Sequence, residues 1–469
     1  MRLFEWLLMG GTLSTLAVLG PWRWQVRGRW RWRIAAATLG IGVVGLLLHV
    51  FVEGTRWQLS IGYVTLALLV LAALRHPLRS SPPPPEASLS GPVARSLTGV
   101  TVFALVMSAV TAWALPVPAL DPPIGPHSVG TRTFSLTDTS RTEIWTDEPD
   151  DVREIPVQAW YPTSVATGQR APLSTRPDVL SATAAEWLGL PSFMLSHLDL
   201  IETSAILNAP LATPTAEPWP VVIYSHGWGG FRSQHLSLLE RLAANGYVVL
   251  AIDHTYAALA SVFPDGHAVP IDRDTLPPEP EDIYAQAAQV LVDTFARDIA
   301  FLDEQIRADQ LPVPIPATDL DTEGIALVGH SAGGGAAMLA CSRIENCATV
   351  IGFDPWVDPL PDDVISAGLT VPLVTLRTSA WMDEPNDDNL RRIHASSTSQ
   401  RLLHIADSIH RDFTMVSDLT PLAEQVGLTD ATGGERVRQV AEELTLDTLG
   451  RVLRGAESPE RTWPEVEEG

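Results

Sequence analysis

The feature that most constrains this chain is a group of long apolar runs, all within its first 120 residues. Ile34–Val52 and Leu97–Leu115 are each 19 residues long and contain no Asp, Glu or Arg. Because a helix rises about 1.5 Å per residue, roughly 20 apolar residues cross the ~30 Å hydrocarbon core of a bilayer. Leu59–Leu74 and Leu3–Gly20 are shorter or less apolar runs of the same kind. The sequence therefore predicts about four transmembrane helices.

Leu3–Gly20 could also be read as a secretory signal peptide. However, no small-x-small cleavage pattern precedes Pro21, and an arginine-rich loop follows where a mature chain would begin. We therefore expect this run to be an uncleaved membrane anchor.

The charge of the chain changes sign near residue 120. Residues 1–120 hold 10 Arg against three acidic residues, a balance of +7, whereas residues 121–469 carry a balance of −31. We therefore expect a membrane domain over 1–120 and a separate catalytic domain over 121–469. Five arginines lie between the first two apolar runs, and Arg75, Arg79 and Arg95 lie between the last two. Since positively charged loops stay in the cytoplasm, the pattern predicts a multi-pass cell-membrane protein with an extracytoplasmic 121–469 domain.

Composition excludes several classes of function. All 31 basic residues are arginine, so no lysine can form a Schiff base or serve a Walker A loop. The net charge of −24 disfavours nucleic acid as a partner, because phosphate binding needs a basic surface. Cys341 and Cys347 cannot build a four-cysteine metal site, and we expect no metal or other cofactor. Outside the cytoplasm we favour a disulfide between them over two small buried apolar side chains.

Gly40, Gly42 and Gly45 match the G-x-G-x-x-G pattern of dinucleotide-binding proteins. That pattern requires a preceding strand, a following helix and an acidic residue ~20 positions later. Here it lies inside Ile34–Val52, where small residues allow helices to pack closely. We therefore interpret it as a helix-packing feature.

After a proline-rich link at 116–126, short apolar runs alternate with amphipathic helical stretches. Continuous apolar runs such as Val221-Val222-Ile223 are typical of parallel strands covered on both faces. The alternation predicts a doubly wound, mostly parallel α/β sheet. The predicted strands are Arg132–Leu136, Glu154–Tyr161, Val221–Ser225, Tyr247–Ile252, Ile325–Val328, Thr349–Phe353, Leu373–Leu376 and Arg401–Ile405. The main predicted helices are Ser233–Ala244, Glu281–Arg307, Ala332–Cys341 and Glu435–Arg454.

Residues 163–218 contain no strand whose pairing the sequence reveals. Helical patterns at Ala182–Leu188 and Phe193–Ile206 lead us to expect a cap beside the active site.

The pentapeptide Gly329-His330-Ser331-Ala332-Gly333 carries the clearest chemical signal. It is the only G-x-S-x-G in the chain, and it follows a predicted buried strand and opens a predicted helix. Glycines two residues to either side of a serine permit the tight turn of an α/β-hydrolase, which exposes the serine hydroxyl. We therefore expect an α/β-hydrolase fold with Ser331 as its nucleophile.

A serine hydroxyl needs a histidine to accept its proton and a carboxylate to orient that histidine. In this fold both follow the serine, which leaves His394, His404 and His410. His404 lies within a predicted strand, whereas His410 follows that strand in a loop at the carboxyl edge of the sheet, so His410 is favoured. Asp354 and Asp383 each follow a predicted strand, and their spacing does not separate them.

Acyl transfer also needs two backbone N–H groups that bind the oxyanion. Ala332, next after the nucleophile, would supply one, and the glycine-rich loop containing Trp228 would supply the other. His226 and Asp253-His254 precede the nucleophile in the chain, so we expect them to order loops around this site.

Five segments, in the same order, resemble the plasma and intracellular type II platelet-activating factor acetylhydrolases. The resemblance covers most of 121–469 and none of the membrane domain. The segments are Ser225-His226-Gly227-Trp228-Gly229-Gly230-Phe231-Arg232, Gly246–His254, Gly329–Gly334, Phe353-Asp354-Pro355-Trp356 and His410–Thr414.

The resemblance implies Asp354 as the acid and the amides of Trp228 and Ala332 as the oxyanion hole. It also implies metal-independent hydrolysis of esters with short or oxidised acyl groups, phospholipids among them. The predicted spans and a short His410–Phe413 segment depart from the family pattern, and these departures bear on the identity of the substrate.

The sequence thus predicts a serine ester hydrolase at a lipid bilayer, with a Ser331-Asp354-His410 triad and a lipid or phospholipid ester as substrate. A general carboxylesterase or polyester hydrolase of similar fold is the alternative enzyme. A membrane-anchored lipid sensor, whose hydrolase domain only binds, is the alternative from another class of protein.

Overall fold

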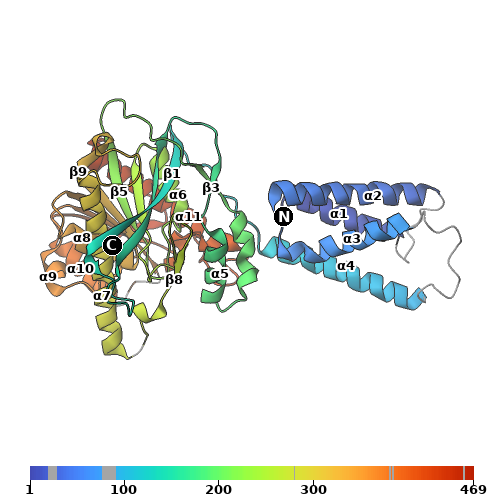
Figure 1. Ribbon diagram of the computed structural model, residues 1–469. Coiled ribbons are helices and arrows are strands. Elements are labelled where there is room, and N and C mark those ends of the chain that lie inside the picture. Colours follow the sequence, from blue (N-terminus) through green and yellow to red (C-terminus); the bar gives the residue numbers. More distant parts are fainter. Residues whose placement is uncertain (20–28, 76–90, 279, 380–381, 383–384, 458–459) are drawn as a thin grey trace. The chain divides into compact units, whose positions relative to one another are not determined.

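The computed structural model describes residues 1–19, 29–75, 91–278, 280–379, 382, 385–457 and 460–469 (Figure 1). The chain divides into two compact units. The first contains Met1–Pro118 together with the short segments Phe193–Leu200 and Leu419–Leu422, and the second contains the remainder. Phe193–Leu200, which the sequence led us to expect in a cap, is therefore part of the first unit.

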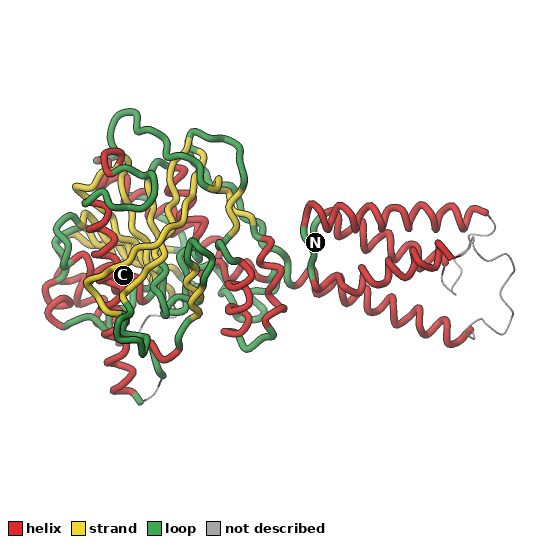
Figure 2. The backbone as a smooth tube through the Cα atoms, viewed as in Figure 1, coloured by secondary structure: helices red, strands yellow, loops and turns green. Residues whose placement is uncertain are grey.

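Apolar helices build the first unit (Figure 2). They are α1 (Leu3–Leu19), α2 (Arg29–Leu48, continued by a π-helical turn at His49–Glu53), α3 (Ser60–Arg75, preceded by a 3-10 turn at Trp57–Leu59) and α4 (Gly91–Ala114). Among the described residues, three stretches are long and apolar enough to cross a membrane: Trp32–Glu53, Trp57–Leu74 and Pro92–Ala114. The α1 helix, with 17 residues, is shorter than these.

Glycines allow α1 and α2 to approach closely. A Cβ atom on Gly11 would lie 2.4 Å from the backbone nitrogen of Gly42, and one on Gly45 would lie 2.6 Å from the backbone nitrogen of Leu8. Residues Gly40 to Gly45 lie inside α2. The G-x-G-x-x-G match is therefore a helix-packing feature, as the sequence predicts.

The acidic residue of α1 is neutralised within the first unit. Nη1 of Arg56 donates to both carboxylate oxygens of Glu5, at 2.9 and 3.1 Å, and both residues are buried. Nη2 of Arg56 also donates to the carbonyl oxygen of Ala112 at 3.0 Å. A buried charge is tolerated when it is paired and hydrogen-bonded, so Glu5 is compatible with the apolar surroundings of α1.

An eleven-stranded sheet forms the centre of the second unit, in the order β13-β12-β11-β10-β9-β5-β6-β2-β1-β4-β3. The strands from β12 to β6 are mutually parallel, and β2 joins β6 in the antiparallel sense. The sheet confirms the predicted α/β architecture. Its strands are β1 (Ser128–Thr142), β2 (Val152–Thr163), β3 (Arg170–Pro172), β4 (Glu202–Leu207), β5 (Trp219–Ser225), β6 (Val248–Ile252), β9 (Leu320–His330), β10 (Cys347–Phe353), β11 (Pro372–Thr378), β12 (Ser399–Ile405) and β13 (Val466–Glu468).

Helices cover both faces of this sheet (Figure 1). On one face α7 (Glu281–Arg307) and α8 (Ala332–Cys341) pack together over Val221, Ile223 and Leu250, which alternate along β5 and β6. On the other face α6 (Leu236–Ala244) packs with α11 (Gly434–Arg454). Smaller elements are α5 (Pro177–Trp187), α9 (Asp362–Ala367), α10 (Pro385–Ser396) and a separate hairpin of β7 (Ala260–Val262) and β8 (Ala268–Pro270).

Part of 163–218 extends the sheet, which the sequence did not predict. The β4 strand pairs in parallel with β1, and β3 pairs antiparallel with β4. The predicted helix at Phe193–Ile206 is therefore wrong in its second half, since only Ser192–Leu200 is helical, as a 3-10 helix. A run as short as Glu202–Leu207 has no periodicity that separates a strand from a helix, and its pairing with a distant strand decides its conformation.

Candidate active site

The candidate site lies at the carboxyl ends of two neighbouring strands, β5 and β9. The chain passes from β5 to β6 on one side and later returns to β9 on the other side of β5. In an open parallel sheet, such a change of direction leaves a crevice between the loops that follow the two strands. The loop after β5 contains Trp228, and the turn after β9 contains Ser331.

Ser331 occupies a sharp turn between β9 and α8. Its φ is 56° and its ψ is −125°, a conformation that costs energy for a residue with a side chain. A Cβ atom on Gly333 would lie 2.2 Å from the carbonyl oxygen of Ser225, and one on Gly227 would lie 3.3 Å from Ser331 Oγ. The glycines thus let the turn pack against the β5 loop, which brings the Ser331 hydroxyl beside Gly227.

Asp354 and His410 are hydrogen-bonded to each other. Nδ1 of His410 donates to Oδ2 of Asp354 at 3.0 Å. Asp354, directly after β10, is buried and also accepts the main-chain N–H of Thr378 at 2.7 Å and the Thr378 hydroxyl at 2.6 Å. These donors leave one carboxylate lone pair directed at the imidazole.

His330 holds the turn that carries His410. The two rings stack with their centroids 4.4 Å apart, and Nε2 of His330 donates to the carbonyl oxygen of His410 at 3.1 Å. Burial is the main cause that lowers the pKa of His330 well below its usual range, so the ring is neutral. Its Nδ1 faces the side-chain amide of Gln234 at 3.4 Å. The sequence analysis did not identify His330 or Gln234 as positioning residues. Their only signal was their place within or next to the glycine-rich segments that contain Ser331 and Trp228.

The two amides predicted for the oxyanion hole belong to different loops. Ala332 is the first residue of α8, and the N–H groups of a first helical turn have no partner inside their own helix. Trp228 lies one residue after Gly227, and its indole N–H donates to Thr275 Oγ1 at 2.9 Å. The Trp187 ring meets the Trp228 ring edge-to-face at a centroid distance of 5.2 Å. The rings of Trp187 and Trp228 therefore form an aromatic wall beside the β5 loop, and the sequence analysis did not single out Trp187.

The other histidines considered from the sequence lie elsewhere. His394, in α10, is bonded to Thr375 and Gln400, and His404, in β12, faces the hydroxyl of Ser379. The alternative acid, Asp383, lies outside the described residues.

A disulfide joins Cys341 and Cys347. It ties the last residue of α8 to the first residue of β10, so it links the helix after Ser331 to the strand before Asp354.

Within the described ranges, the group of side chains spaced as metal ligands is Glu5, His49 and Glu53, in the first unit. Arg56 already neutralises Glu5, and His49 Nδ1 bonds to Glu53 at 3.0 Å. This group is therefore an internally paired network.

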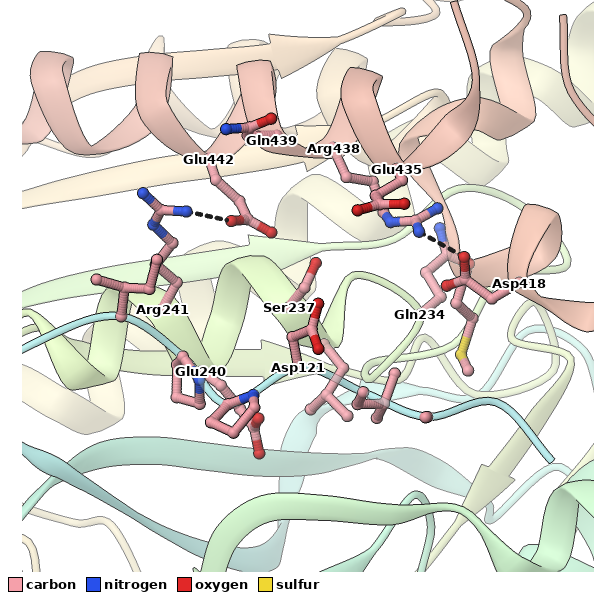
Figure 3. Close-up of a pocket in the computed structure, with 17 residues that line it drawn as sticks. Asp121, Gln234, Ser237, Glu240, Arg241, Asp418, Glu435, Arg438, Gln439 and Glu442 are labelled. Carbon is pink, nitrogen blue, oxygen red and sulfur yellow. Dashed lines mark hydrogen bonds and ion pairs between the residues drawn. The ribbon is translucent and has the colours of Figure 1, made fainter. Parts of the chain in front are cut away.

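A cavity of about 390 Å³ lies between α6, α11 and the segment 119–124 (Figure 3). Arg241 pairs with Glu442 at 3.0 Å and Arg438 pairs with Asp418 at 2.6 Å across its walls. Glu240 also lines it, and burial raises the pKa of this carboxyl to about 7. Ser331, Asp354 and His410 do not line this cavity, whereas Gln234, which faces His330, does.

The sheet order, the strained serine turn after a central parallel strand and the Asp354–His410 bond define the α/β-hydrolase class. Within that class, residues 122–289 and 303–446 match the family model of platelet-activating factor acetylhydrolase, isoform II. The chain belongs to this family.

Two relatives carry the name of this family, and a solved esterase structure is similar to the chain. The platelet-activating factor acetylhydrolase of Canis lupus familiaris is 27% identical over 256 residues, which cover 49% of this chain and 56% of that protein. The protein of the same name from Bos taurus is 24% identical over 258 residues, covering 48% and 57%. The chain thus spans a little over half the length of these relatives. A ferulic acid esterase from Streptomyces cinnamoneus is similar in structure, with a TM-score of 0.59, 25% identity and coverage of 76% of this chain and 99% of that one.

Proposed function

We propose that this protein is a serine ester hydrolase with a Ser331-Asp354-His410 triad. His410 takes the proton of Ser331 as the hydroxyl attacks the ester carbonyl, and the oxyanion binds the amides of Trp228 and Ala332. His410 then protonates the leaving alcohol. Water, activated by the same imidazole, releases the acyl group from the serine.

The observation that carries this proposal is the bond between His410 Nδ1 and the buried Asp354 carboxylate at 3.0 Å. A carboxylate only accepts hydrogen bonds, so it holds the proton of a neutral His410 on Nδ1. Nε2 is then the nitrogen that accepts the serine proton. The positive φ of Ser331 supports its role as nucleophile, because such strain persists where the surrounding structure requires it.

We further propose that the substrate is a lipid or phospholipid ester with a short or oxidised acyl group. The family membership and the names of the relatives support this class of substrate. We also propose that the apolar N-terminal helices anchor the protein in the cell membrane, with the 121–469 domain on the extracytoplasmic side. An enzyme attached to a bilayer meets lipid esters at a high local concentration.

The test compares the purified full-length protein with Ser331→Ala in detergent micelles. We expect wild-type turnover of a 2-acetyl phospholipid and at least a ~10³-fold loss in the variant, since the nucleophile is removed. Ser342→Ala, assayed under the same conditions, is the control, because it makes the same side-chain change at the exposed end of α8. Equal turnover by Ser331→Ala and wild type would disprove the triad.

The likeness to a ferulic acid esterase favours a second candidate, a general carboxylesterase. Hydrolysis of soluble aryl esters at rates equal to or above those of phospholipid esters would support it. Activity confined to lipid esters would support the first proposal, and binding of lipids with no turnover of any ester would support a sensor.

A further inference from the structure

A second Ser-His-Asp chain lies next to the candidate site, and it is entirely buried. Ser225 Oγ lies 2.8 Å from His254 Nε2, and His254 Nδ1 lies 2.9 Å from Asp298 Oδ2. All three residues have 0% exposure, so no substrate reaches this serine. The arrangement must therefore serve a purpose other than nucleophilic attack.

Asp298 determines the protonation of His254. Burial alone would raise the pKa of Asp298, but Arg153, at 2.6 Å, and His254 hold that pKa well below its usual range. Arg141 donates to the same carboxylate at 2.8 Å. An ionised carboxylate only accepts hydrogen bonds, so His254 carries its proton on Nδ1. Burial lowers the pKa of His254 to about 3, so the ring is neutral and its Nε2 accepts the Ser225 hydroxyl.

The backbone of His254 in turn determines the tautomer of His226. The main-chain N–H of His254 donates to Nε2 of His226 at 3.1 Å, so that nitrogen carries no proton. Burial lowers the pKa of His226, and the neutral ring therefore holds its proton on Nδ1. That N–H donates to the carbonyl oxygen of Gly227 at 2.7 Å. The main-chain N–H of Gly230 donates to the same oxygen at 2.8 Å.

These two bonds fix the peptide that joins Gly227 to Trp228. A trans peptide is planar, and its C=O and N–H point in opposite directions. The direction of the Trp228 N–H is therefore set by what binds the Gly227 oxygen. Gly227 packs against the nucleophile, since a Cβ atom there would lie 2.8 Å from Ser331 Cβ. The fixed peptide thus lies directly beside the serine.

We propose that His226 is a positioning residue for the oxyanion hole, and that the buried Ser225-His254-Asp298 chain holds the His254 backbone that sets its tautomer. The inference rests on the proposed function, where the Trp228 amide binds the oxyanion. Without the His226 Nδ1–H, the Gly227–Trp228 peptide loses one of its two restraints. Stabilisation of the transition state falls, whereas binding of the ground-state ester does not.

The kinetic test uses two variants of the full-length protein. In His226→Phe the ring volume stays and both hydrogen bonds are lost, and we expect kcat to fall ~10²-fold with KM changed less than ~3-fold. In His226→Asn the side-chain amide can still donate to the Gly227 oxygen, and we expect kcat within ~10-fold of wild type. His394→Phe is the matched control, because it also removes two hydrogen bonds from a buried ring. We expect its kcat to stay within ~2-fold of wild type.

Equal kcat in His226→Phe and wild type would overturn the inference. So would equal losses in the Phe and Asn variants, or a change in KM alone, because these results indicate packing rather than orientation.

A second measurement does not depend on turnover. Nitrogen-15 NMR of histidine-labelled full-length protein, with the signal assigned by its loss in His226→Asn, reports the tautomer of His226. We expect a neutral ring protonated on Nδ1 throughout pH 5–8. A ring protonated on Nε2, or one that becomes charged in this range, would overturn the inference even in an active enzyme. An inactive wild type with the expected tautomer would instead reject the proposed function and leave the hydrogen-bond arrangement standing.

Discussion

The carboxylate of Asp354 accepts three hydrogen bonds, and these bonds determine how a substitution at this position would affect the site. One oxygen accepts the Thr378 main-chain N–H, and the other accepts the Thr378 hydroxyl and the His410 imidazole. The backbone bond requires an acceptor at the first oxygen. At the residue scale, the chemistry of this position therefore depends on the second oxygen alone.

We predict that Asp354→Asn lowers kcat by ~10³–10⁴-fold, with little loss of stability. The Asn oxygen can keep the Thr378 N–H, which places its NH₂ group against His410 Nδ1. His410 then moves its proton to Nε2 and can no longer accept the serine proton. Steady-state kinetics and the urea unfolding midpoint test this prediction. A variant with near-wild-type kcat would point to another acid.

Glu240 provides a prediction for pH and stability. It is 2% exposed and accepts the main-chain N–H of Ala205 at 2.8 Å, and burial raises its pKa to about 7. Between pH ~4.5 and ~7 the folded state keeps a proton that the unfolded state has lost. The contribution of Glu240 to stability is therefore full below pH ~4.5 and lost as pH rises to ~7. The difference between the folded and unfolded pKa of Glu240 corresponds to about 3 kcal/mol of unfolding free energy.

We predict that Glu240→Gln unfolds at a higher urea concentration than wild type at pH 8, and that the difference shrinks at pH 5. The Gln oxygen still accepts the Ala205 N–H, so the change removes only the ionisation. Glu435→Gln, on the wall of the same cavity, is the control. The prediction fails if wild type and Glu240→Gln differ equally at the two pH values.

At the junction of β9 and α8, the backbone of the first helical turn packs directly against the backbone of the β5 loop, with no side chain between them. Gly333 lies in the first turn of α8 and touches the backbone that leads out of β5. Gly450 lies inside α11, and a Cβ atom there would lie 3.8 Å from the nearest neighbouring atom, Ala456 Cβ. At the element scale, only the first of these two helical glycines is required by close packing.

We predict that Gly333→Ala lowers stability by ~1–3 kcal/mol and abolishes most ester turnover, because its methyl group would separate α8 from the β5 loop. Gly450→Ala should leave activity unchanged and stability equal or slightly higher, since alanine favours a helix. The urea unfolding midpoints and the kcat values of the two variants test this predicted difference. Equal behaviour of the two variants would contradict the prediction.

The disulfide between Cys341 and Cys347 anchors the end of the same helix, α8. Cys341 and Cys347 are only six residues apart in sequence, so they close a short loop and we expect reduction to cost about 2 kcal/mol of stability. Thiol labelling should modify neither cysteine in the oxidised, denatured protein and both after reduction. Labelling before reduction would show that the cysteines are unpaired.

At the scale of the whole molecule, the composition of residues 1–120 suits a lipid bilayer, and that of residues 121–469 suits water. Residues 1–120 are apolar with a charge balance of +7, and residues 121–469 have a balance of −31. Three described helices in the first part have the length and apolarity of membrane spans.

We predict that the full-length protein stays in the membrane pellet after alkaline carbonate washing. In spheroplasts, external protease should remove a C-terminal tag while a cytoplasmic marker remains intact. A tag protected until the membrane is permeabilised would reverse the proposed orientation. Release by carbonate would exclude membrane-spanning helices.

Much of the architecture could be predicted from local patterns. The helices Glu281–Arg307 and Ala332–Cys341 and the strand run at Val221–Ser225 have strong apolar patterns, and the structure forms them at those positions. Ser331 was identifiable because its turn needs glycines at fixed spacing. β4 was not, because six residues carry too little pattern to specify a partner strand.

The sequence by itself thus determined where the chain is apolar, where it turns and which serine can be exposed, since these properties depend on neighbouring residues. Only the tertiary structure decided that Glu5 is neutralised by Arg56 and that Asp354 faces His410. It alone showed that Asp298, in a helix far along the chain, orders His254 beside the β5 loop. These pairings join residues 44 to 56 positions apart, and hydrogen bonds act only over the short distances that the completed fold creates.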